Sequence, residues 1–143
     1  MFKDQGDVQK EQREGLAKWG SFEAGKALLD LGGGETVRDA ETLQIICCAG
    51  VCRKYPQSNA VGLAWAFFGE GIGSKMVPIT RRIREYLHEQ HMRFNRIEMI
   101  CDPDFAIMPR WAKLIGMTLE HERLRGFGPE GEDQSLWARW RDG

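Results

Sequence analysis

A glycine-rich segment, residues 69–74, follows an apolar run and precedes a long amphipathic stretch. Glycine lets a backbone approach a ligand closely, and free amides at a helix N-terminus suit a pyrophosphate group. The segment therefore predicts a phosphate-binding turn formed by Gly69, Gly71, Gly73 and Ser74. A plain strand-to-helix connection is the alternative, because many glycine-rich loops bind nothing.

Carboxylates are expected at the ends of predicted strands, where a general base could lie. Glu70 and Asp102 are the candidate catalytic residues, and Asp104 is a third carboxylate of this kind. Each could remove a proton from a substrate if it stood within hydrogen-bond reach. The alternative is a turn or capping role, which Asp-Pro-Asp sequences such as 102–104 often have.

The cysteines and histidines predict no metal site. Cys47, Cys48 and Cys52 lack the paired short spacing of zinc ligands and lie in or beside apolar segments, which favours buried thiols over a zinc site or disulfides. His88 and His91 are three residues apart on a predicted helix. Without a third ligand they are interpreted as surface histidines.

The elements that must position these residues follow from hydrophobic periodicity and turn signals. The segments 32–34, 49–50 and 56–59 read as breaks, and Ser74 is expected to cap the longest helix. Helices are expected at 7–19, 21–31, 75–92 and 106–115, and strands at 42–48, 51–55, 60–68, 96–101, 118–125 and 134–140.

Length and composition limit the class of protein. We expect 143 residues to form a single domain, 1–143, with a helical N-terminal part (1–40) and a sheet core (41–143). A net charge of −1 argues against a dedicated nucleic-acid-binding protein. No apolar run reaches the ~20 residues of a membrane span, and the first residues lack a signal peptide's apolar core. A cytoplasmic protein, not secreted, is therefore expected.

The segment Arg110 to Met117, followed by charged residues 120–123 and a glycine-containing hairpin tip, resembles the GNAT superfamily of acetyltransferases. The resemblance covers about residues 60–140. It implies an α/β (α+β) fold with a mixed central β-sheet flanked by helices, here with additional N-terminal helices. It also implies acetyl-CoA or CoA as cofactor, with Gly71 and Gly73 at the glycines of the superfamily's pyrophosphate motif and no metal.

Two positions depart from the superfamily's pattern. Phe68 stands where the pyrophosphate motif has arginine or glutamine. Ala112 follows the aromatic Trp111 where many members have the tyrosine that protonates the CoA thiolate. Neither tyrosine of the chain, Tyr55 or Tyr86, falls at that place.

These departures leave three functions open. The first is a non-catalytic GNAT-like domain acting through contacts with other protein subunits. A narrower resemblance, resting on Trp65, residues 80–82 and Trp111, is to GNAT-like virion or assembly proteins of short-tailed bacteriophages, which implies virion partners and a virion location. The second is an acetyl-CoA-dependent N-acetyltransferase. The third is a module that binds small molecules or peptides on the same fold.

Overall fold

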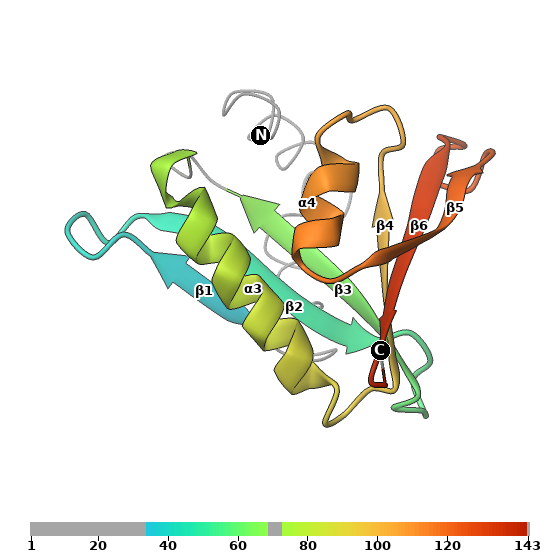
Figure 1. The fold of residues 1–143 in the computed structure, drawn as a ribbon, viewed down its shortest axis with the longest axis horizontal. Helices are drawn as coiled ribbons and strands as arrows, with labels where there is room; N and C mark the ends of the chain where they lie inside the picture. The colour runs from blue at the N-terminus through green and yellow to red at the C-terminus, as the bar shows by residue number, and fades with distance from the viewer. Residues whose placement is uncertain (1–33, 69–72, 143) are drawn as a thin grey trace.

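The protein's computed structural model describes residues 34–68 and 73–142 (Figure 1). The predicted helices at 7–19 and 21–31, together with Gly69, Glu70 and Gly71, lie outside the described residues. A six-stranded mixed sheet has the order β1-β2-β3-β4-β6-β5. The elements are β1 (Glu35–Arg38), β2 (Ile45–Arg53), β3 (Val61–Phe68), the short 3-10 helix η1 (Gly73–Lys75), α3 (Met76–Gln90), β4 (Arg96–Cys101), α4 (Met108–Leu114), β5 (Thr118–Leu124) and β6 (Gln134–Trp140).

One pair of strands is parallel and the other pairs are antiparallel. β3 and β4 run parallel because α3 carries the chain back across the sheet between them. The pairs β1–β2, β2–β3, β4–β6 and β5–β6 are antiparallel. The mixed α/β sheet predicted from the sequence is confirmed.

Both described α-helices pack on the same face of the sheet (Figure 1). The apolar stripe of α3 is buried, as its helical period predicts. The strand residues on this face, including Val51, Ile97 and Trp137, complete the core together with α4's Trp111. Placing apolar surface from two helices and the sheet in one core is the dominant stabilising contribution.

Most predicted elements after residue 60 are confirmed, and the strand 96–101 matches its predicted bounds. The short helix stops where expected, since Gly116 has a φ of 90°, which favours glycine. The predicted cap of α3 is wrong. Lys75 occupies the N-cap position without a side-chain bond, because Ser74 lies inside η1.

The predictions before residue 60 need two corrections. The expected break at 49–50 does not exist: β2 continues through it, since Ala49 and Gly50 pair with Ala66 and Trp65 on β3. The segment 1–40 is not helical throughout, because Glu35–Arg38 forms β1 at the sheet edge. A strand this short and polar shows little of the alternating hydrophobic pattern by which a strand is predicted.

His91 is buried, so its interpretation as a surface histidine is wrong. Its Nδ1 donates to the carbonyl of Phe94 at 2.9 Å, and its Nε2 accepts from Nε of Arg139 at 3.1 Å. These two bonds fix the neutral tautomer. Burial lowers the pKa of His91 below its usual value, and the nearby Arg139 acts in the same direction.

Candidate active-site cleft

The two parallel strands separate partway along their length. Pairing between β3 and β4 runs from Val61 and Arg96 to Leu63 and Glu98, and there it ends. β3 continues to Phe68 and stays paired with β2 over that distance. From Ala64 to Phe67, β3 is not paired with β4, so backbone amides and carbonyls on that side of the strand need another partner.

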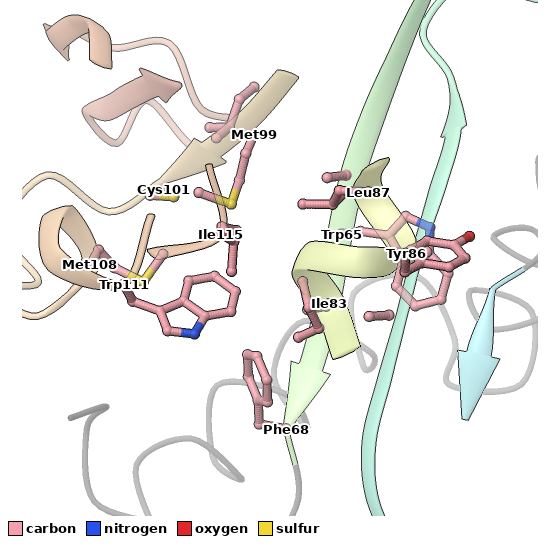
Figure 2. A pocket seen from close by; sticks show the side chains of 15 residues that line it. Trp65, Phe68, Ile83, Tyr86, Leu87, Met99, Cys101, Met108, Trp111 and Ile115 are labelled. Carbon is pink, nitrogen blue, oxygen red and sulfur yellow. The ribbon is translucent and has the colours of Figure 1, made fainter. Parts of the chain in front are cut away.

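An apolar cavity of about 140 Å³ lies beside this separation, between the sheet and the two helices. Figure 2 shows side chains of α3 on one side of it and those of β4 and α4 on the other. Only two of the lining residues contribute a hydroxyl or a thiol. The lining residues are Ala49, Gly50, Ala64, Trp65, Ala66, Phe68, Ile83, Tyr86, Leu87, Met99, Ile100, Cys101, Met108, Trp111 and Ile115.

Trp111 joins the elements around the cavity. Its indole Nε1 donates to Oγ1 of Thr80 on α3 at 3.0 Å, which ties α4 to α3. Its ring also meets Phe68 edge-on, with the ring centroids 5.9 Å apart (Figure 2). The aromatic residue predicted from the helix 106–115 is therefore a wall of the cleft and part of the core.

The ionisable groups that line the cavity are neutral near pH 7. Burial raises the pKa of the Cys101 thiol to about 12. Burial also raises the pKa of Tyr86, whose hydroxyl is hydrogen-bonded to the backbone of Val51 on β2. A protonated thiol is a weak nucleophile, so Cys101 contributes apolar surface to the cleft.

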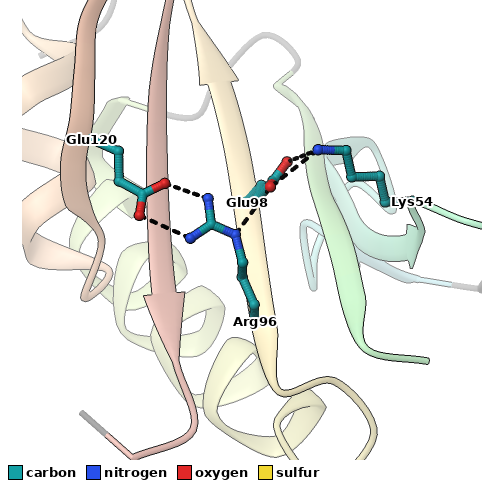
Figure 3. Close-up of polar contacts among 4 residues, drawn as sticks. All are labelled: Lys54, Arg96, Glu98 and Glu120. Atoms are coloured by element: carbon teal, nitrogen blue, oxygen red, sulfur yellow. Dashed lines mark hydrogen bonds and ion pairs between the residues drawn. The ribbon is translucent and has the colours of Figure 1, made fainter. Parts of the chain in front are cut away.

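A row of charged side chains crosses the opposite face of the sheet (Figure 3). Glu98 accepts from Nζ of Lys54 at 2.9 and 3.1 Å and from Nε of Arg96 at 3.0 Å. Arg96 in turn binds the carboxylate of Glu120 on β5. Glu98 is buried, and its backbone lies at the last pair before β3 and β4 separate, with its carboxylate on the face opposite the cavity.

The described site residues predicted from the sequence lie at the ends of elements that border the cavity, and none of them is among its lining residues. Gly73 and Ser74 are exposed in η1, directly before α3, and the N-terminus of a helix is a position that suits an anion. Asp102 is exposed in the turn after β4, and its Oδ1 accepts from the amide of Asp104 at 2.9 Å. Asp104 also binds Arg123 on β5.

Sequence reasoning missed Glu98 and the alanines that line the cavity. Glu98 is a single acidic residue inside an otherwise apolar run, Ile97 to Cys101, and such a residue signals a buried, paired charge. No comparable signal marks Ala49 or Ala66. Their significance depends on cross-strand register, which places them opposite each other.

Within residues 34–68 and 73–142, no group of three or more His, Cys, Asp or Glu is placed to hold a metal ion. The same residues contain no helix long and apolar enough to cross a membrane.

Solved structures share this arrangement. A chimera of the spermidine N-acetyltransferase from Vibrio cholerae superposes with a TM-score of 0.68 at 11% identity, covering 99% of this chain and 94% of that one. The ribosomal-protein-S5-alanine acetyltransferase from Vibrio fischeri gives 0.62 at 16% identity, with coverages of 87% and 71%. A GNAT-family acetyltransferase from Bacillus anthracis gives 0.62 at 16% identity, with coverages of 76% and 66%. The chain has the GNAT fold.

Identities this low establish the fold alone. No protein-family model matches the sequence of this chain, and no curated protein matches it. The predicted likeness to the GNAT superfamily is confirmed at the level of the fold. The narrower likeness to bacteriophage virion proteins has no support, because the neighbours named here are acetyltransferases.

Proposed function

We propose that this protein is an N-acyltransferase that moves an acyl group, acetyl in the simplest case, from CoA to an amine. The main observation in support of this proposal is that β3 separates from β4 beside an apolar cavity. The neighbours support the proposal, since those named above are acetyltransferases. They favour it over the virion role, which we do not propose.

The unpaired side of β3 is suited to the pantetheine arm of CoA. That arm carries two amide groups, and an extended ligand can pair with an open strand edge as an added strand would. The edge from Ala64 to Phe67 offers such groups. At one end of this edge, amides of Gly73 and Ser74 at the start of α3 would hold the pyrophosphate with the help of the helix dipole. Gly69 and Gly71 are proposed to complete that turn.

The reaction requires two proton transfers. The amine nitrogen attacks the thioester carbonyl, a C–N bond forms and the C–S bond breaks. One amine proton goes to a base, and the CoA thiolate takes up a proton. Glu70 and Asp102 remain the proposed bases from the sequence. Glu98 is a further candidate, because it lies where the strands separate on the face opposite α3.

Ala112 and Phe68 stand where the GNAT pattern has a proton-donating tyrosine and a phosphate-binding side chain. Ala112 is buried and has no proton to give, so the thiolate would be protonated by water. Phe68 packs against Trp111, so its ring supports the cleft wall and leaves phosphate binding to backbone amides. A non-catalytic binding domain is the second candidate, and Ala112 is the observation that favours it.

Calorimetric titration with CoA and acetyl-CoA tests the proposal. We expect a micromolar Kd for both, lost in Gly73→Trp because a bulky side chain would fill the pyrophosphate turn. Gln57→Trp, in the exposed turn before β3, is the matched control and keeps the affinity. Absence of binding at millimolar CoA would contradict the proposal.

If CoA binds, release of free thiol in the presence of an amine panel separates the two candidates. Turnover supports the enzyme, and binding without turnover supports the non-catalytic domain. Asp102→Asn and Glu98→Gln then show which carboxylate takes the proton, since loss of the base lowers kcat at unchanged Kd for CoA.

A further inference from the structure

The cavity extends beyond the gap between β3 and β4. It reaches under α3 to β2, where Ala49 is one of its lining residues. Ala49 pairs with Ala66 on β3, and Ala64 lies two residues along on the same face of the sheet. These three alanines form the floor of this part of the cavity, below Ile83 and Leu87 of α3. We call it the alanine floor.

Empty apolar volume is costly in a protein interior, and native cores keep few voids larger than a water molecule. A dry cavity of about 150 Å³ lined by aliphatic and aromatic groups is large enough to bind benzene. The cavity here is of similar size, about 140 Å³. It can therefore hold an apolar group of roughly six carbon atoms.

The polarity of the lining selects which part of an acyl-CoA could fill this space. The pantetheine amides need hydrogen-bond partners, and the open edge of β3 provides them. The alanine floor and the α3 side chains above it provide none, apart from the hydroxyl of Tyr86, which is already bonded to Val51. A hydrocarbon chain needs no such partner.

We propose that the alanine floor makes this protein selective for acyl donors with chains of about four to six carbons over acetyl. Ala49, Ala64 and Ala66 are its specificity-determining residues. The inference rests on the proposed function, because it requires CoA in the cleft. The bonds made and broken are those of the acyl transfer described above, and chain length changes none of them.

The test is calorimetric titration of the full chain with CoA and with its acetyl, butyryl, hexanoyl and decanoyl thioesters. Each buried methylene adds favourable transfer free energy, so hexanoyl-CoA is expected to bind at least about tenfold more tightly than acetyl-CoA. Decanoyl-CoA is expected to bind no more tightly than hexanoyl-CoA, because the cavity is then full.

Ala49→Leu places extra carbon atoms in the cavity from β2, outside the β3 edge proposed to hold pantetheine. It is expected to abolish the tenfold preference for hexanoyl-CoA while the Kd for CoA and acetyl-CoA stays within about twofold. Ala60→Leu is the matched control: Ala60 is exposed before β3, outside the cavity lining, and this variant keeps the preference. If thermal unfolding shows that Ala49→Leu is not folded, Ala49→Val is the smaller replacement, with a smaller loss of preference.

The outcomes separate the two proposals. Equal affinity for CoA and for every thioester would overturn the chain-length selectivity and leave the proposed function standing. Failure of every one of these ligands to bind would overturn the proposed function and the selectivity with it. A preference for hexanoyl-CoA that survives in folded Ala49→Leu and Ala49→Val would overturn the assignment to the alanine floor.

Discussion

Replacing Glu98 by glutamine tests how the charged row on the sheet contributes to stability. Glu98→Gln preserves size and shape but removes the negative charge that binds Lys54 and Arg96. The new amide nitrogen is also a hydrogen-bond donor, and it cannot bond to the ammonium group of Lys54, which has only donors. The change therefore isolates the electrostatic contribution of one buried carboxylate.

The cost follows from how well each partner can be solvated again. Removing one member of a fully buried ion pair costs about 3–5 kcal/mol, because the other charge is left without a partner. The side chain of Lys54 is 35% exposed and can return to water, whereas that of Glu98 is only 8% exposed. Arg96 keeps the carboxylate of Glu120. We therefore expect a loss of about 2 kcal/mol in the free energy of unfolding, below the fully buried case.

Urea denaturation measures this loss. With an m value of about 1–3 kcal/mol/M, the midpoint is expected to fall by about 1 M. Asp133→Asn, which breaks the surface pair with Arg123, is the control and should lower the midpoint much less, because water and salt screen an exposed pair. A cost below about 0.5 kcal/mol for Glu98→Gln, or one equal to the control, would refute the reasoning that burial makes this row important.

Three further predictions concern packing and protonation. Gly62→Ala would place a Cβ 2.5 Å from Cγ1 of Val51, so we expect about 1–3 kcal/mol of destabilisation by overpacking in urea denaturation; an unchanged midpoint would show that β2 moves aside. Burial raises the pKa of both the Cys47 and the Cys101 thiol to about 12, so iodoacetamide should label them only as fast as the chain unfolds; faster labelling in peptide mass spectra would contradict their burial. Because the pKa of His91 is lowered in the folded chain, the unfolded chain binds a proton below about pH 6.5 that the folded chain does not. The free energy of unfolding should therefore decrease as the pH falls through this range. Urea denaturation between pH 5 and 7 should show this decrease, and His91→Gln should flatten it.

The sequence by itself determined the elements that are long or sharply bounded. The helix predicted at 75–92 follows from the helical spacing of its apolar residues, and the strand predicted at 96–101 follows from its short apolar run. Both signals lie within a few consecutive residues of the sequence. Gly116 marked the end of α4 because its backbone conformation suits glycine. The GNAT-like arrangement after residue 60 could be predicted for these reasons, together with the turn and the cleft-lining helix around Trp111.

Only the tertiary structure decided where the strands separate and what lies between them. The continuity of β2 through Gly50 depends on β3 pairing alongside it, and the edge strand β1 is held by partners distant in sequence, such as Arg82 on α3. The burial of His91 depends on Arg139, which is 48 residues away in the chain. The cavity depends on Ala49 and Ala66 meeting across two strands. Such contacts join residues that no local window of sequence contains, so the cavity could not be predicted from the sequence pattern.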